Sequence, residues 1–327
     1  MLAYVFPGQG SQYVGMGRDL HDAYPEAREV FQEADDVLGF RISRLCFEGP
    51  EDALRDTANA QPAILTMTVA CLRALESHLE VALEVPRFLA GHSLGLFSAL
   101  FHSKALDFRW ALRLVRERGE QMCVAGRLTE GGMAAIIGLD DDTVRGICQE
   151  VRQDCEPLLA DGDSQYGGVW VANQNCPGQV VVSGERRAVR AASDLATERG
   201  AKKVVPLAVS IPSHCPLMIP AVEGLSEWIS ELELREPSIP VIGNVTGRPL
   251  RTAEEIKEEL LMQLVSPVQW TQSVQYMLAQ GVDTFVEIGP RQVLGSLIRR
   301  IDRGARVTSL ESAPTLEAFV EAWGGEK

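Results

Sequence analysis

The stretch RFLAGHSLG, residues 87–95, gives the clearest indication of the fold. Residues 87–90 predict a short buried strand, and an apolar helical pattern begins directly after the stretch. Between the two lies GHSLG, a G-x-S-x-G pattern whose glycines allow a strained turn that lifts the serine hydroxyl above a sheet. A serine in such a turn can also be a simple helix N-cap. The flanking strand and helix favour the first interpretation, so we predict an α/β fold with Ser93 as a nucleophile.

The N-terminal segment shows a similar arrangement. Residues 3–6 predict a short strand, and the loop PGQGSQ at residues 7–12 contains two glycines that let its backbone approach a ligand closely. Helical spacing of apolar residues follows over residues 17–38 and 62–79. Strands that alternate with helices in this way indicate a parallel sheet.

The middle of the chain follows a different pattern. It predicts a strand, a helix, two strands, a helix and a strand, at residues 133–138, 140–151, 169–173, 179–183, 185–198 and 202–206. This βαββαβ order is typical of a ferredoxin-like unit. Residues 155–168, rich in Asp, Gly and Ser, predict an exposed loop within it.

The α/β pattern returns after this unit. Strands are predicted at residues 239–244 and 284–288, and helices at 253–264, 271–280 and 293–301. We therefore predict an α/β-hydrolase-like large subdomain with a parallel sheet, interrupted by an inserted ferredoxin-like small subdomain. The expected division is residues 1–130 and 207–327 for the large subdomain and 131–206 for the small one.

Composition excludes several classes of function. The 327 residues include 45 acidic and 31 basic ones, a net charge of −14, and such a field repels nucleic acids and anionic membranes. Seven cysteines without a C-x-x-C pair indicate reduced intracellular thiols and no structural zinc. The apolar run at residues 2–6 is far shorter than a signal-peptide core or a membrane helix of about 20 residues. We expect a cytoplasmic protein without nucleic-acid, membrane or metal partners.

A serine nucleophile needs a neighbouring base, most often histidine. Among five histidines, four lie on predicted helices or directly beside Ser93: His21, His78, His92 and His102. The fifth, His214, lies in IPSHCP at residues 211–216, a loop with prolines on both sides. By elimination we predict that His214 is the base.

The sequence also suggests which groups orient the histidine and stabilise the oxyanion. No acid between Ser93 and His214 stands out as the group that orients the imidazole, so we expect a carbonyl or an amide, with Gln263 and the backbone near 266–267 as candidates. An oxyanion needs two N–H donors. The residue after the serine, Leu94, and Gln9 between its two glycines are placed to supply them.

Six motifs, taken together, resemble one family. They are FPGQGSQ at 6–12, GHSLG at 91–95, Arg118-Gly119, N-x-PGQVV at 175–181, Pro212-Ser213-His214 and PVQW at 267–270. In this order, and over residues 5–301, they resemble the malonyl-CoA:acyl carrier protein transacylase family. The fold of that family, a hydrolase-like subdomain with a ferredoxin-like insertion, agrees with the pattern found above.

The resemblance also implies roles for single residues. It implies that Ser93 is the acylated serine and His214 its base, and that the amides of Gln9 and Leu94 form the oxyanion hole. It also implies that Arg118 binds the malonyl carboxylate and that the backbone of Gln263 orients the histidine. A planar guanidinium can hold a carboxylate with two parallel hydrogen bonds. The residues at 108–122 include four arginines, however, so the sequence singles out Arg118 only through the resemblance.

The expected reaction is transfer of a malonyl group from coenzyme A to the phosphopantetheine thiol of an acyl carrier protein, through an acyl-serine and without a cofactor. Alternatives are a polyketide-synthase acyltransferase acting in trans with another acyl group or donor, a hydrolase of acyl carrier proteins, and a non-catalytic carrier-binding module. Leu96-Phe97 stands where the family usually has an acidic residue and tyrosine, which predicts a less polar pocket rim.

Two basic segments are candidates for docking an acidic carrier protein. Residues 185–203 hold six basic and three acidic side chains, and residues 291–306 hold five basic and one acidic. The docking candidates are Lys202, Lys203, Arg299 and Arg300. The alternative is that these residues are ordinary solvated helix faces.

Overall fold

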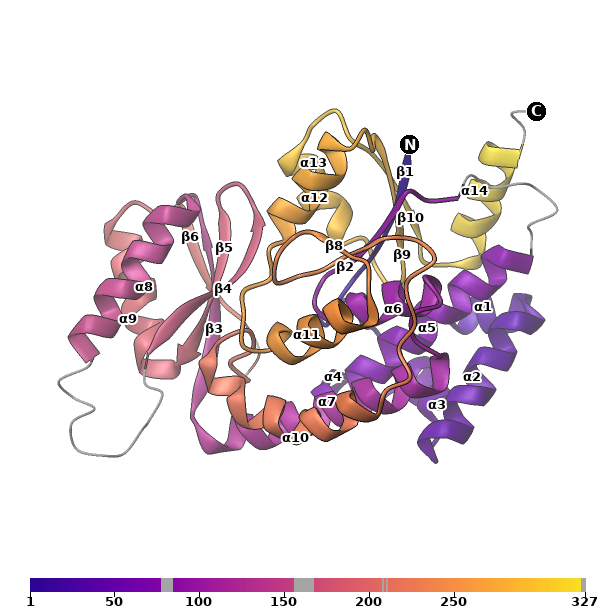
Figure 1. Ribbon diagram of the computed structural model, residues 1–327, viewed down its shortest axis with the longest axis horizontal. Helices are drawn as coiled ribbons and strands as arrows, with labels where there is room; N and C mark the ends of the chain where they lie inside the picture. The colour runs from indigo at the N-terminus through magenta and orange to yellow at the C-terminus, as the bar shows by residue number, and fades with distance from the viewer. Residues whose placement is uncertain (78–84, 156–167, 208, 210, 325–327) are drawn as a thin grey trace.

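Two β-sheets organise the chain in the computed structural model, which describes residues 1–77, 85–155, 168–207, 209 and 211–324. In the view of Figure 1 the smaller sheet lies at the left, with α8 (Asp141–Cys155) and α9 (Arg186–Glu198) against it. The larger sheet lies among the helices at the centre and right. The two are joined through Val268, whose N–H donates to the Ala172 carbonyl at 2.8 Å and whose carbonyl accepts from the Gln174 N–H at 3.0 Å. An edge strand of the small sheet is therefore bonded directly to the large part of the molecule.

The larger sheet has six strands in the order β10-β9-β1-β2-β7-β8. Their bounds are β1 Leu2–Phe6, β2 Phe88–Gly91, β7 Val241–Ile242, β8 Pro249–Leu250, β9 Thr284–Ile288 and β10 Arg306–Leu310. The first five in spatial order are parallel, and β8 runs antiparallel to β7. The α/β fold with a parallel sheet is thus confirmed, with one antiparallel edge strand that the sequence did not predict.

Side chains of β1 alternate between two layers of helices. Leu2, Tyr4 and Phe6 belong to the larger hydrophobic cluster, which also holds buried apolar residues of the long helices α5 (Thr57–Ser77) and α7 (Phe108–Leu128). Ala3 and Val5 belong to a second cluster with buried residues of α12 (Trp270–Ala279) and α13 (Leu294–Ile301). Both faces of the central strand are covered, which is why its residues are apolar throughout.

Helices surround this sheet on both faces. Their bounds are α1 Arg18–Ala23, α2 Pro25–Leu38, α3 Ile42–Glu48, α4 Glu51–Arg55, α5 Thr57–Ser77, α6 Gly95–His102, α7 Phe108–Leu128, α10 Ile219–Glu231, α11 Ala253–Gln263, α12 Trp270–Ala279, α13 Leu294–Ile301 and α14 Ala313–Gly324, with a 3₁₀ turn at Pro216–Met218. No helix of the described part is long and apolar enough to cross a membrane.

The smaller sheet is antiparallel, in the order β4-β5-β3-β6. It consists of β3 Gly131–Ile137, β4 Val169–Cys176, β5 Gln179–Glu185 and β6 Lys203–Pro206, with helices α8 Asp141–Cys155 and α9 Arg186–Glu198. The predicted βαββαβ order is therefore confirmed. The division of the chain at 130/131 and 206/207 stays a prediction. It agrees with the strand order, since each sheet contains strands from only one of the two predicted subdomains.

Several predicted elements were wrong in detail. The single helix expected over 17–38 is two helices, because Tyr24 is extended and Pro25 starts a new helix at its first turn. The strand expected over 239–244 pairs only at Val241–Ile242. Helix α8 continues to Cys155, where the predicted loop was to begin, and residues 156–167 of that loop lie outside the described residues.

Close backbone packing at the start of α6 gives a test of this fold. A Cβ at Gly95 would lie 2.0 Å from the Phe6 carbonyl oxygen, whereas a Cβ at Gly146 in α8 would meet nothing within 4 Å. We expect Gly95→Ala to destabilise the protein by about 3 kcal/mol or more. The control Gly146→Ala should stabilise it by up to about 1 kcal/mol. Urea unfolding measures both, and a Gly95→Ala variant as stable as wild type would contradict this packing.

Candidate active site

The predicted nucleophile stands on a strained turn between β2 and α6. Ser93 has a φ of 50°, in the left-handed region that L-residues seldom adopt. The turn is tight, since a Cβ at Gly91 would lie 1.9 Å from the carbonyl carbon of Gly95. Both glycines of the GHSLG motif are therefore required by backbone contact, which supports the nucleophile-elbow interpretation over a simple helix cap.

His214 lies against this serine. Its Nε2 is 2.9 Å from Ser93 Oγ, and its Nδ1 is 2.8 Å from the Gln263 carbonyl oxygen. Because a carbonyl oxygen only accepts hydrogen bonds, Nδ1 must carry the proton, which leaves the lone pair of Nε2 facing the serine hydroxyl. The ring is therefore held in the tautomer that a base requires, by a backbone carbonyl of α11 and without a carboxylate.

The imidazole is also held neutral. Burial, and secondly the nearby Arg118 cation, lower the pKa of His214 to about 3. The side chain is 4% exposed, so water cannot stabilise an imidazolium there. At neutral pH His214 is therefore uncharged, with the lone pair of its Nε2 unprotonated.

A buried guanidinium completes the site. Arg118 Nη2 donates to Ser93 Oγ at 3.1 Å and to Gln263 Oε1 at 3.0 Å, and Nη1 donates to Gln61 Oε1 at 2.7 Å. Burial lowers the pKa of Arg118 to about 9, which still leaves it charged at neutral pH. No carboxylate among the described residues pairs with it. A buried cation without an anionic partner is costly, and a ligand carboxylate would supply the missing charge.

Packing explains why only this arginine of α7 reaches the site. Arg109 pairs with Glu33 and Arg116 with Glu120, both at the surface. A Cβ at Gly119 would lie 2.6 Å from the Ala58 Cα, so glycine there lets α7 lie close against α5. This close packing brings the neighbouring Arg118 into the interior.

The predicted oxyanion donors are free to act. The loop carrying Gln9 packs on the elbow, since a Cβ at Gly8 would lie 2.4 Å from the His92 carbonyl oxygen. In the described part of the chain, neither the Gln9 nor the Leu94 N–H donates to a protein acceptor. The structure thus leaves both N–H groups without a protein acceptor, while their role stays a prediction.

This geometry agrees with what comparison with known proteins shows. The family model described as "Acyl transferase domain" matches residues 3–318. The chain belongs to the acyl transferase family. The malonyl CoA-acyl carrier protein transacylase of Bacillus subtilis strain 168 is 41% identical over 320 residues, covering 98% of this chain and 96% of the relative.

Solved structures agree with this assignment. A type II polyketide-synthase acyl carrier protein in complex with its malonyl transacylase is similar with a TM-score of 0.90 and 40% identity, over 98% of this acyltransferase and 99% of that chain. The acyl-carrier-protein S-malonyltransferase of Bartonella henselae has a TM-score of 0.90 and 38% identity, with 99% of each chain covered. The likeness extends over nearly the whole length, so the predicted family and fold are confirmed.

Sequence reasoning missed the residue whose side chain hydrogen-bonds the backbone of the nucleophile elbow in this acyltransferase. Asn244 is buried; its Oδ1 accepts from the Ser93 N–H at 2.7 Å and its Nδ2 donates to the Gly91 carbonyl at 2.7 Å. Glu259, also buried, accepts from the Asn244 N–H at 2.7 Å. Asn244 follows the short strand β7, and an asparagine at the carboxyl end of a parallel strand was the feature that could have indicated it.

The other residues of the elbow motif also have partners. His92 Nε2 is 2.9 Å from Asn175 Oδ1, so the histidine beside the nucleophile contacts the small sheet rather than Ser93. Leu96 is fully buried, and the ring centroid of Phe97 lies 5.6 Å from the Arg118 guanidinium carbon. The apolar pair predicted at the pocket rim therefore includes an aromatic ring against the buried cation.

The docking candidates lie at one end of the small sheet. Arg300 Nη2 donates to the Pro177 carbonyl at 3.3 Å, and its Nη1 bonds Gln179 at the start of β5. Gln179 and Lys203 both pair with Ile137, one on each side of β3. Lys202, Lys203, Arg299 and Arg300 are all exposed. Arg300 therefore also holds α13 against the small sheet, and Arg299 donates to the Val307 carbonyl of β10 at 2.9 Å. Lys202 and Lys203 have no side-chain partner among the described residues and remain available to a partner.

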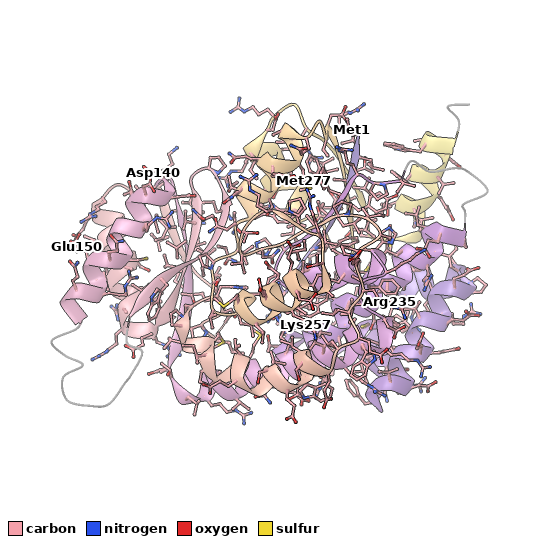
Figure 2. The ribbon with its side chains drawn as sticks, in the orientation of Figure 1. Met1, Asp140, Glu150, Arg235, Lys257 and Met277 are labelled. Carbon is pink, nitrogen blue, oxygen red and sulfur yellow. The ribbon has the colours of Figure 1, made fainter. Side chains whose placement is uncertain are left out.

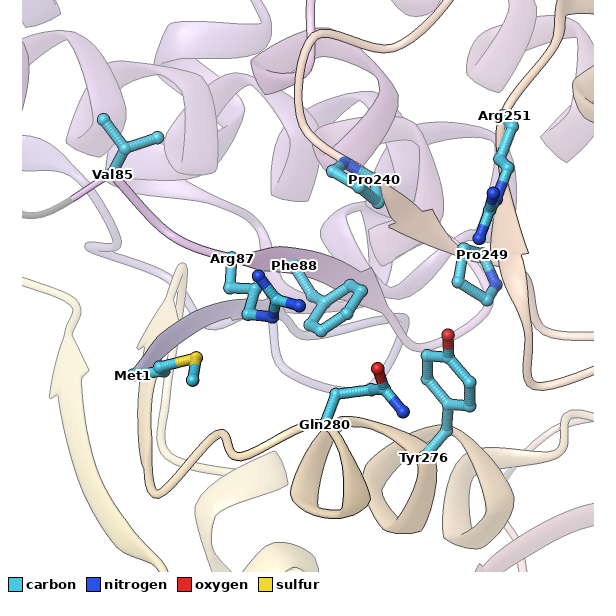
Figure 3. Close-up of a pocket in the computed structure, with 9 residues that line it drawn as sticks. All are labelled: Met1, Val85, Arg87, Phe88, Pro240, Pro249, Arg251, Tyr276 and Gln280. Atoms are coloured by element: carbon cyan, nitrogen blue, oxygen red, sulfur yellow. The ribbon is translucent and has the colours of Figure 1, made fainter.

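A cavity of about 620 Å³ lies elsewhere (Figure 3). Arg87, Phe88 and Met1 line it at the amino ends of β1 and β2. Ser93 follows the carboxyl end of β2, so this cavity is separate from the site.

Figure 2 shows the position of α11 in the molecule, where Lys257 is labelled. The last residue of this helix is Gln263, whose backbone carbonyl contacts His214.

The support from Asn244 can be tested directly. Asn244→Ala leaves the Ser93 N–H and the Gly91 carbonyl without partners, so we expect serine acylation to slow about 10- to 100-fold through misplacement of the hydroxyl. Asn59→Ala, which removes an asparagine that bonds Arg116 outside the site, is the matched control. Stopped-flow acylation with both variants measures the effect, and equal rates would show that Asn244 does not support the elbow.

Proposed function

We propose that this acyltransferase transfers a malonyl group from coenzyme A to the phosphopantetheine thiol of an acyl carrier protein, through an ester on Ser93. The observation that carries the proposal is the buried guanidinium of Arg118, 3.1 Å from Ser93 Oγ and without a carboxylate partner among the described residues. An acyl group that ends in a free carboxylate satisfies this cation while its thioester carbonyl lies at the serine. The names of the relatives support the same substrate and acceptor.

In the first half-reaction Ser93 Oγ attacks the thioester carbonyl while its proton passes to Nε2 of His214. The N–H groups of Gln9 and Leu94 stabilise the oxyanion of the tetrahedral intermediate. The intermediate collapses by breaking the carbon–sulfur bond, and the imidazolium returns the proton to the coenzyme A sulfur. The products are the malonyl-serine ester and free coenzyme A.

The second half-reaction is the reverse with a different thiol. The carrier-protein thiol loses its proton to His214 and attacks the ester carbonyl, and Ser93 leaves with that proton. Throughout, the carboxylate stays on Arg118, which holds the ester carbonyl in register with the oxyanion donors. Both steps are acid–base and acyl-transfer chemistry that these side chains supply.

One alternative has specific support. A solved neighbour is a complex with a type II polyketide-synthase carrier protein, so the acceptor of this chain is a carrier protein of either polyketide or fatty-acid synthesis. A hydrolase is disfavoured because it gains nothing from the unpaired arginine. We place the reaction in the cytoplasm, supported by the free thiols of all six cysteines whose side chains are described.

Docking of the carrier protein is assigned to the basic end of the small sheet, around Lys202, Lys203, Arg299 and Arg300. This end is close to the elbow, because Asn175, four residues before Gln179, contacts His92 next to Ser93. An acidic carrier protein must overcome the repulsion of a chain with net charge −14, and a local group of cations provides the attraction.

Intact-mass analysis tests the reaction. Wild-type protein incubated with malonyl-CoA should gain one malonyl mass, which holo carrier protein then removes as malonyl carrier protein. Ser93→Ala should gain none, and His214→Ala should acylate about 10² to 10⁴ times more slowly. An adduct on Ser93→Ala would exclude this serine, and release of the adduct by water as fast as by the carrier protein would identify a hydrolase.

Charge reversal tests the docking surface. Lys203→Glu should raise the KM for carrier protein about 10-fold at low salt and less at high salt, because salt screens exposed charges. Arg28→Glu on α2, with the same change in net charge, is the control. Acylation by malonyl-CoA should be the same in both variants. Equal KM values for the two variants at low ionic strength would move docking to another surface.

A further inference from the structure

The charge of Arg118 depends on what holds its guanidinium. Two amide oxygens do so: Gln61 Oε1 accepts from Nη1 at 2.7 Å, and Gln263 Oε1 accepts from Nη2 at 3.0 Å. Both acceptors are neutral, so they orient the cation without cancelling its charge. Buried arginines are usually paired with carboxylates. Two neutral partners instead indicate that the charge of Arg118 is kept for another group.

The two glutamines differ in what else they contact. Gln263 also bonds His214 through its backbone oxygen, and its Nε2 donates to the Ser93 carbonyl at 3.0 Å. A change at Gln263 would therefore disturb the nucleophile and base directly. Gln61 is fully buried on α5, and its only side-chain partners in the described structure are Arg118 and Met122.

The orientation of the Gln61 amide follows from its partners. Its Nε2 is 3.3 Å from Met122 Sδ, a weak acceptor, and its oxygen faces the arginine. The reversed amide would set two N–H donors against each other at Arg118 and leave the oxygen beside a sulfur that cannot donate. Position 61 therefore presents one acceptor oxygen to Nη1 and nothing that carries charge.

We propose that Gln61 is a specificity-determining residue, whose neutral amide orients Arg118 and leaves its positive charge available to the free carboxylate of the substrate. The inference rests on the proposed function and adds to it the reason why the cation is unpaired. A glutamate at this position has the same length and would place a carboxylate on Nη1. It would ionise beside the guanidinium and make the pocket neutral before substrate enters.

The consequence concerns discrimination between acyl groups. In a neutral pocket a malonyl carboxylate loses its hydration and gains no net ionic partner, whereas an acetyl group loses nothing. Selectivity should then shift from charged toward uncharged acyl groups. If the Gln61 amide served only to fill space, no such shift is expected, because a glutamate of equal volume would then affect all substrates alike.

The experiment compares Gln61→Glu with the neutral, similarly sized control Gln61→Leu. Initial rates of Ser93 acylation are measured with malonyl-CoA and acetyl-CoA by intact mass. We expect the malonyl-to-acetyl ratio of kcat/KM to fall about 100-fold in Gln61→Glu, mostly through slower malonyl transfer. In Gln61→Leu the guanidinium is less well held but still unpaired, so both rates fall and malonyl stays preferred.

Two further measurements separate specificity from misfolding. Inactivation by phenylmethanesulfonyl fluoride, a neutral reagent for active serines, reports the Ser93–His214 pair and should slow far less than malonyl transfer in Gln61→Glu. Met122→Glu, compared with Met122→Gln, places a carboxylate near the same Nη1, which is 3.5 Å from the Met122 sulfur. It should shift the ratio in the same direction, which keeps the proposal testable should Gln61→Glu not fold.

The outcomes distinguish this inference from the proposed function. Equal losses with malonyl- and acetyl-CoA, or an unchanged ratio in both carboxylate variants, would overturn the role of Gln61 while leaving malonyl transfer intact. A wild-type protein that prefers acetyl-CoA would instead refute the malonyl assignment itself, and with it the reason for an unpaired Arg118.

Discussion

One buried positive charge constrains the rest of this active site. The guanidinium of Arg118 lies in the interior with only neutral partners around it: the side chains of Gln61, Gln263, Met122 and Ser93. Holding such a charge away from water is unfavourable unless a fold fixes its neighbours firmly. Here the helices α5, α7 and α11 supply those neighbours, and the close contact at Gly119 draws α7 inward.

The same charge explains the unusual support of the base. A carboxylate that oriented His214, as in a Ser-His-Asp triad, would add a negative charge to the site that contains Arg118. The carbonyl oxygen of Gln263 orients the imidazole without adding charge. The cation also helps to lower the pKa of His214, so that the base stays neutral until substrate arrives. One uncompensated arginine thus offers a partner for a substrate carboxylate and helps to keep the imidazole uncharged.

Much of the fold followed from local patterns. The strand-turn-helix at residues 87–95, the βαββαβ order and the loop before His214 all depend on periodicity and on glycine or proline at defined positions. The elements that were missed have weaker patterns. Strand β10, for example, is an edge strand whose burial alternates only partly. Strand β7 was expected over 239–244 but pairs only at Val241–Ile242. Asn244 lies two residues beyond the paired part, and its support of the elbow was not predicted.

By itself the sequence determined the chemistry available: a serine on a strained turn, one histidine placed by elimination, and a set of motifs typical of acyl carrier protein transacylases. It could not decide which arginine of α7 is buried at the site, because the arginines of this helix, Arg118 among them, differ only in the neighbours that packing gives them. It could not assign Gln61 or Asn244 either, since both act through residues far away in the chain. Only the tertiary structure brings such residues together. Once they are buried, the charge or neutrality of each side chain sets the electrostatics of the site, because water no longer screens it.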